Sequence, residues 1–120
     1  MKDMNCIESV NELLIQPLIA DEYGLENLFA FKVEGVEMNR VVLPGSLAIV
    51  HQTNEWQDGN IVAVRIENKR MLFRARREDE KVLFVPESRD VFLRSWVYDP
   101  SEGLDVEILG EYIYSVNFAS

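Results

Sequence analysis

The sequence holds one cysteine and one histidine in 120 residues, and their scarcity removes several classes of chemistry. Cys6 has no partner for an internal disulfide, which favours a reducing, intracellular setting. Cys6 and His51 lie far apart without the spacing of metal ligands, so we expect neither a metal nor another cofactor. No apolar run approaches the roughly 20 residues that span a bilayer, and the N-terminus lacks a signal-peptide core. The sequence therefore predicts a cytoplasmic protein without a membrane partner.

Positive charge is scarce as well, with 12 Lys and Arg against 21 Asp and Glu and a formal net charge of -9. Non-specific binding to nucleic acid depends on a concentrated positive surface, so we expect no such binding by this chain alone. Seven of the basic residues fall between positions 65 and 81. On strands such residues usually form a solvated face or pair with neighbouring acids, and we prefer this interpretation to a phosphate-binding stripe.

Only one segment carries a helical pattern, and it spans residues 5–20. Four apolar residues fall at three- and four-residue spacing on one helical face: Ile7, Val10, Leu14 and Leu18. Asn5 is a candidate N-cap, and Pro17 should end or kink the helix near Ile15 because it lacks an N–H. The polar stretch at 21–27 is typical of a connection. We therefore predict an N-terminal helix with its connection at 1–27 and a single domain at 28–120.

Strand signals dominate from residue 28 onward. Phe29, Phe31 and Val33 alternate with other residues, which places an aromatic stripe on one face. Further apolar or β-branched runs are bounded by turn signals and lie at 47–50, 61–66, 70–75, 81–85, 106–109 and 112–118. Short strands at close spacing predict a mostly β fold, a curved antiparallel β domain with one short N-terminal helix.

Five short motifs follow one another in a distinctive order over residues 28–118. They are Gly35-Val36-Glu37-Met38, Pro44-Gly45, Asp58-Gly59-Asn60-Ile61-Val62, Val85-Pro86-Glu87-Ser88 and Ile108-Leu109-Gly110-Glu111-Tyr112-Ile113. In this order and spacing the chain resembles the C-terminal domain of LexA-like and lambda-type phage repressors. The resemblance implies the fold of a serine–lysine self-cleaving peptidase.

The same resemblance implies that the catalytic dyad is lost. The family's nucleophilic serine falls on Glu37, and its lysine base falls on Phe73, or on Arg74 if the register slides by one residue. Phe73 has no lone pair to accept a proton, and a guanidinium stays protonated. Residues 1–34 also lack the Ala-Gly or Cys-Gly bond that self-cleaving members cut. We therefore predict a pseudo-peptidase, in which Phe73 turns the old cleft into packed apolar surface.

Other candidate residues are open to more modest interpretations. Glu37 is expected to be a solvated or salt-bridged turn residue, with Arg74 as a candidate partner. Ser46 and His51 could form a nucleophile and base, but their odd separation on a strand points them to opposite faces. Trp56 lies in a polar loop and either folds over the sheet edge or is exposed for a partner. The sequence does not decide between the two.

The functional hypothesis is a non-catalytic oligomerisation domain of a phage- or prophage-type transcriptional repressor. In the resembled family this domain pairs subunits, so we expect a dimer or higher oligomer, with DNA bound only through a module missing from this chain. An antirepressor protein is a possible further partner. The alternatives are a stand-alone, antirepressor-like partner of a related repressor and a residual peptidase with a displaced nucleophile such as Ser46. The predicted self-association surface comprises Trp96, Tyr98, Val106, Ile108, Tyr112, Tyr114 and Phe118.

Overall fold

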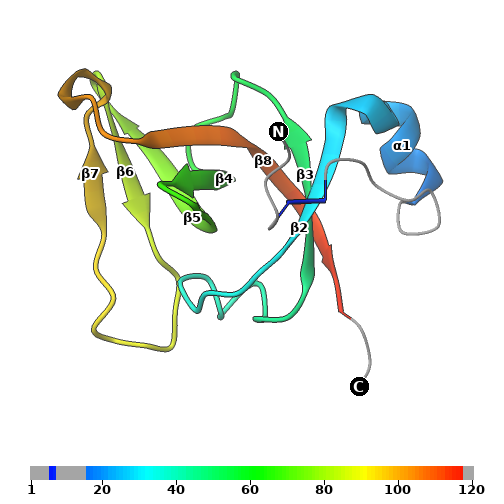
Figure 1. Ribbon diagram of the computed structural model, residues 1–120, viewed down its shortest axis with the longest axis horizontal. Coiled ribbons are helices and arrows are strands. Elements are labelled where there is room, and N and C mark those ends of the chain that lie inside the picture. The colour runs from blue at the N-terminus through cyan, green and yellow to red at the C-terminus, as the bar shows by residue number, and fades with distance from the viewer. Residues whose placement is uncertain (1–5, 8–15, 118–120) are drawn as a thin grey trace.

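Eight antiparallel strands form one sheet in the computed structural model, which describes residues 6–7 and 16–117 (Figure 1). The strands are β1 (Cys6–Ile7), β2 (Leu28–Lys32), β3 (Leu47–Gln52), β4 (Ile61–Ile66), β5 (Lys69–Glu78), β6 (Lys81–Val85), β7 (Trp96–Tyr98) and β8 (Val106–Val116). Their order across the sheet is β1-β2-β3-β8-β4-β5-β6-β7. The predicted fold class, a mostly β antiparallel domain with one short helix, is confirmed.

Strand β8 joins the two halves of the sheet. Its first part pairs with β4 from Val106 to Glu111, and its second part pairs with β3 from Gly110 to Val116. Figure 1 shows β8 crossing the molecule from the β5–β7 side to the β2–β3 side. The prediction of two closing strands at 106–109 and 112–118 is therefore wrong. Register shifts in both ladders let one strand continue through the point at which its partner changes.

Gly110 occupies the point at which β8 is paired on both edges. It lies opposite Gln52 of β3 and Ala63 of β4. A Cβ atom at this position would lie 2.0 Å from the carbonyl oxygen of His51, which belongs to the backbone and cannot rotate away. Only glycine therefore allows the close approach of β3 to β8 here.

The N-terminal region differs from the helix predicted at 5–20. Cys6 and Ile7 form strand β1 against β2, and the described helix is α1 (Pro17–Tyr23), followed by the 3-10 turn η2 (Leu25–Asn27). Pro17 begins the helix instead of ending it, because the first turn of a helix does not use the missing N–H. Residues 8–15 lie outside the described residues. Helix α1 packs its Ile19 and Tyr23 beside the β2–β3 core.

Three groups of buried side chains form the core. The group between β4, β5 and β6 contains Trp56, Val62, Val64, Phe73, Ala75, Val82 and Phe84. A second group, under the turn that follows β2, contains Phe29, Phe31, Val33, Met38, Val42, Ala48, Val50, Ile61, Ala63 and Leu72. The third group lies under α1 and contains Leu28, Ala30, Leu47 and Ile49. Strand β7, which the sequence pattern did not predict, adds Trp96 and Tyr98 to the first group.

Gly110→Ala is expected to destabilise the domain by about 1–3 kcal/mol, because the new methyl group forces the β3 and β8 backbones apart. Urea denaturation measures the change in the free energy of unfolding. Gly35→Ala is the matched control, since its added Cβ would meet only the movable end of the Glu37 side chain. Equal urea midpoints for the two variants would contradict the proposed role of Gly110.

Candidate functional site

The Gly35–Met38 motif forms a turn anchored by Met38. The N–H groups of Val41 and Val42 donate to the carbonyl oxygen of Met38 at 2.8 and 2.7 Å. The Met38 side chain is 2% exposed and shares its core group with Val33, Val42 and Leu72. A short polar turn is thus held in place by one buried apolar side chain.

Glu37 is half-buried and lines a cavity of about 340 Å³ beside that turn. The cavity wall also includes the cationic residues Lys32, Lys69 and Arg70. The ion pair suggested between Glu37 and Arg74 is not formed. Arg74 instead pairs with Glu87, because the strand register of β5 and β6 brings those two side chains together.

The contact between Arg74 and Glu87, here called the Arg74–Glu87 clasp, ties three segments together. The Arg74 guanidinium donates Nη2 and Nε to the carboxylate of Glu87 at 2.8 and 3.2 Å, and Nη1 to the carbonyl oxygen of Gly59 at 3.1 Å. The N–H of Glu87 donates to the Glu37 carbonyl oxygen at 2.8 Å, and the Glu87 carbonyl accepts from the N–H of Arg40 at 3.0 Å. A charged bidentate pair therefore holds the Gly35–Met38 turn against the end of β6.

The clasp was missed in the sequence, although a signal for it exists. Arg74 lies opposite Val85 across the β5–β6 hairpin, and Glu87 follows Val85 by two residues. Residues two apart on an extended chain share a face, so a correct hairpin register places the carboxylate beside the guanidinium.

Phe73 lies in the interior, 3% exposed, as the prediction of packed apolar surface requires. Its ring centroid is 5.6 Å from that of Phe84 and 6.4 Å from that of Trp96, the latter in an edge-to-face arrangement. Neighbouring residues on a strand point to opposite faces, and Leu72 belongs to the core group of Met38. Phe73 therefore points away from the face on which the turn of Glu37 packs, and the structure does not bring the two positions together.

Ser46 and His51 do not form a nucleophile–base pair. Ser46 is 2% exposed, and its hydroxyl donates to Oδ1 of Asn117. The His51 ring instead packs on Tyr23, with a centroid separation of 4.6 Å. Among the residues that the structure describes, no three His, Cys, Asp or Glu side chains gather into a group that could hold a metal ion.

Trp56 folds over the sheet, which settles the question that the sequence left open. It is 6% exposed and packs in the core group of Phe73 and Phe84. The Arg77 guanidinium carbon lies 3.8 Å from the centroid of its ring, and Nη2 of Arg77 donates to the Trp56 carbonyl at 2.9 Å. This cation–π contact covers the outer side of the indole.

The basic residues between positions 65 and 81 are largely engaged within the chain. Arg65 contacts Asp105 at 2.9 Å and Glu107 at 3.4 Å, and the hydrogen bond to Asp105 raises the pKa of Arg65 above its ordinary value. Arg74 and Arg77 have the partners described above. The preference for pairing with neighbouring acids over a phosphate-binding stripe is confirmed for Arg65 and Arg74, whereas the Arg77 guanidinium binds Trp56.

The side chains predicted for self-association lie mostly against the core. Trp96, Tyr98, Val106 and Ile108 pack beside the β4–β6 group. Tyr112 packs beside the group of Met38, and Tyr114 beside the group under α1, while Phe118 lies outside the described residues. The backbone of the same strand is less enclosed. From Tyr112 to Val116, β8 pairs with β3 on one edge, and no strand of the described part of the chain pairs with the other edge.

The comparisons with known proteins agree with the resemblance that the motifs indicated. A family model described as Peptidase S24-like matches residues 9–113. The LexA repressor of Hahella chejuensis is 35% identical over 83 residues, which cover 68% of this chain and 41% of that protein. The LexA repressor of Clostridium perfringens is 29% identical over 107 residues, 88% of this chain and 49% of that protein. The chain thus spans less than half the length of these relatives. No helix in the described ranges is long and apolar enough to cross a bilayer.

Arg74→Ala is expected to lower the free energy of unfolding by about 1.5–3 kcal/mol, because it leaves the Glu87 carboxylate without its charged hydrogen bonds. Urea denaturation measures the loss. Arg76→Ala, an exposed position two residues along β5, is the control and should change the midpoint little. If the two variants were equally stable, the clasp would not be holding the turn.

Proposed function

The chain belongs to the peptidase S24-like family, and on that premise we propose that it is the non-catalytic assembly domain of a LexA-like transcriptional repressor. Its DNA-binding activity would reside in a separate module, and the cytoplasm is the compartment in which such a repressor would work. The relatives that carry the name LexA repressor are more than twice as long as the stretches they share with this chain. That length leaves room for another module in proteins of this kind.

The absence of catalysis follows from the chemistry of two positions. Serine–lysine hydrolysis needs a hydroxyl nucleophile and a neutral amine that can take its proton. Glu37 offers a carboxylate, and Phe73 offers an aromatic ring buried among other rings. Ser46, the candidate for a displaced nucleophile, is enclosed, and no base contacts it in the described residues. A domain without nucleophile and base can still bind and assemble.

The observation that carries the proposal is the unpaired edge of β8 from Tyr112 to Val116. An exposed strand edge presents backbone N–H and C=O groups that a second strand can satisfy. Two copies that pair these edges antiparallel would form a twofold, self-complementary contact. Such a contact would extend the sheet across the dimer, and the inward packing of Tyr112 and Tyr114 would keep the edge rigid.

Assembly would give this acidic domain its role in DNA binding. With a net charge of -9, the chain is unsuited to contact phosphate directly. Joining two DNA-binding modules raises their effective concentration at neighbouring half-sites, which strengthens binding without any new contact to DNA. Because cleavage would be absent, release of the operator would need another protein, and an antirepressor is the class of partner that fits.

Ile113→Lys is expected to convert the dimer into a monomer. Ile113 is half-buried on β8 and lies at the register shift opposite β3, and a lysine on a strand edge opposes pairing with another strand. Sedimentation velocity over a wide concentration range measures the mass. Val97→Lys is the matched control on β7, an edge strand separated from β8 by three other strands, and should leave the dimer intact. A parent protein that stays monomeric at high concentration would overturn the proposal.

The purified protein is expected to keep a single intact mass after days at alkaline pH. Among the described residues no base contacts the Ser46 hydroxyl, and Glu37 and Phe73 do not form a nucleophile–base pair. Intact-protein mass spectrometry checks this. Ser46→Ala serves as the control. Fragments from the parent that disappear in Ser46→Ala would establish the residual peptidase instead.

A further inference from the structure

One end of the molecule displays apolar side chains in an ordered loop. In the segment that links β6 to β7, Val91 is 76% exposed and Phe92 is 83% exposed. The Phe92 N–H donates to Oδ1 of Asp90 at 3.0 Å, and the Asp90 N–H donates to Oγ of Ser88 at 3.0 Å. The Arg89 N–H donates to Asn39 of the facing turn at 2.8 Å. These bonds hold the loop in a conformation that leaves both apolar side chains in solvent.

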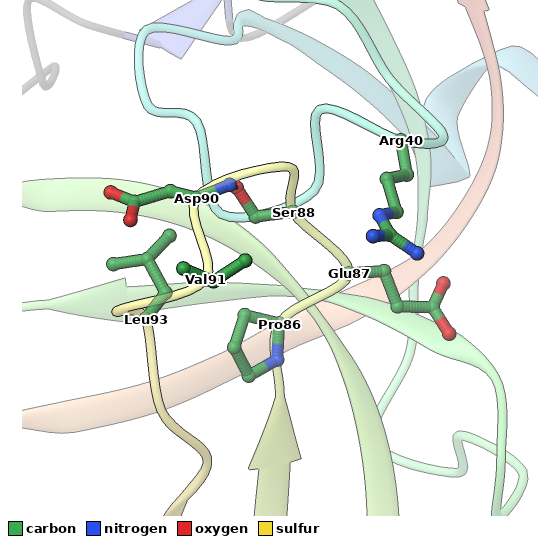
Figure 2. Close-up of a pocket in the computed structure, with 7 residues that line it drawn as sticks. All are labelled: Arg40, Pro86, Glu87, Ser88, Asp90, Val91 and Leu93. Atoms are coloured by element: carbon green, nitrogen blue, oxygen red, sulfur yellow. The ribbon is translucent and has the colours of Figure 1, made fainter.

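Three exposed arginines lie in or beside this loop, and their ion pairing differs from that of the arginines on the sheet. Arg65 and Arg74 form ion pairs with carboxylates, whereas within the described residues Arg40, Arg89 and Arg94 form none. A cavity of about 510 Å³ lies at the same place (Figure 2). It is lined by Arg40, Pro86, Glu87, Ser88, Asp90, Val91 and Leu93, and of its two acids Glu87 is already paired with Arg74. We call Arg40, Arg89, Val91, Phe92 and Arg94 the basic patch.

The opposite end of β7 carries the complementary chemistry. The 3-10 turn η3 (Pro100–Glu102) and its flanks include the acidic residues Asp99 and Glu102, and Leu104 is 51% exposed beside them. The Asp99 carboxylate accepts hydrogen bonds from the Ser101 N–H and hydroxyl, and these lower its pKa, so it is charged near neutral pH. We call Asp99, Glu102 and Leu104 the acidic patch.

The charges around the acidic patch are predominantly negative. No lysine or arginine follows position 94 in the sequence. The β5–β6 turn at the same end of the sheet adds three acids at 78–80. The nearby cations are fewer than the acids: Lys81 faces Asp99, Arg65 is bound to Asp105, and Arg76 and Arg77 precede the turn on β5. The patch therefore offers carboxylates around one exposed leucine, as the basic patch offers arginines around one exposed phenylalanine.

The two patches lie at opposite ends of β7, so one chain cannot close them on each other (Figure 1). We propose that the basic patch of one copy docks on the acidic patch of a second copy, with Phe92 against Leu104 and the arginines beside Asp99 and Glu102. Exposed ion pairs contribute little individually, so the apolar contact supplies the affinity and the charges supply orientation. In such a pair one copy keeps a free acidic patch and the other keeps a free basic patch. The contact is therefore head-to-tail and would link dimers formed through β8 into longer assemblies.

The test uses the Ile113→Lys background, in which pairing through β8 is removed, so that the two contacts are measured separately. Sedimentation velocity should show a mass that grows with concentration at low salt and falls at high salt, where charges are screened. Phe92→Ser should weaken this association by about tenfold or more, the size of effect typical of a central interface residue. Val36→Ser, at an exposed valine outside both patches, is the control.

A mixing experiment makes the result sharper. One variant carries Arg89→Glu and Arg94→Glu and keeps its acidic patch; the other carries Leu104→Glu and keeps its basic patch, so that the two altered patches repel each other. Each alone should stay monomeric, and an equimolar mixture should form a heterodimer and nothing larger, because only one intact pair of patches remains. All these positions are exposed, so unchanged urea midpoints should confirm folding.

Two results would overturn the proposal. The first is failure of the contact: the mixture remains monomeric, or the Phe92→Ser variant self-associates as strongly as the Ile113→Lys protein that lacks this change. The second is binding of a single-stranded oligonucleotide that requires Arg89 and Arg94 while the mixture stays monomeric, which would make the basic patch a nucleic-acid site. If Ile113→Lys fails to separate the β8 dimer, the proposed function fails. The mixture would still report the patch contact, since its mass would exceed that of either variant alone.

Discussion

The close approach of β3 and β4 to β8 at Gly110 is the constraint on which the fold depends. β8 is the one strand of the described sheet that pairs with both halves, and both ladders include Gly110. The ladder with β4 positions the aromatic core of Phe73 and Phe84, and the ladder with β3 positions the core under α1. The turn that carries Glu37 lies between these halves, so its place relative to β5 follows from how β8 joins them.

The region around the Gly35–Met38 turn shows how neighbouring residues of one strand serve two different faces. In the two-residue period of β5, Phe73 joins the aromatic interior while Arg74 points to the turn. The Arg74–Glu87 clasp then holds the turn through backbone hydrogen bonds to Glu37 and Arg40. The position of the turn is thus maintained by an ion pair with a structural role, and Glu87 contacts the backbone carbonyl of residue 37.

Much of the fold could be predicted from the sequence because the strand signals are local. The runs at 61–66 and 81–85 coincide with β4 and β6, and the run at 70–75 lies within β5. The helix at 5–20 was mispredicted because the three- and four-residue spacing of apolar residues does not by itself show where a helix begins. Cys6 and Ile7 form a strand instead, and the described helix begins at Pro17. β7 has only three residues, and its pairing with β6 depends on the long loop before it, which no local pattern encodes. The family motifs located Glu37 and Phe73, but the side of β5 that each faces required the sheet register.

The position of β8 in the chain has a consequence for the timing of synthesis. Every other strand of the described sheet precedes it, and its partners in β3 and β4 lie 40 to 69 residues upstream, so these pairings are strongly non-local. While a ribosome is still adding residues before 106, the β2–β3 and β4–β7 portions have no strand to join them. The nascent chain therefore exposes both inner edges until β8 emerges, and only then can the two halves close into one sheet.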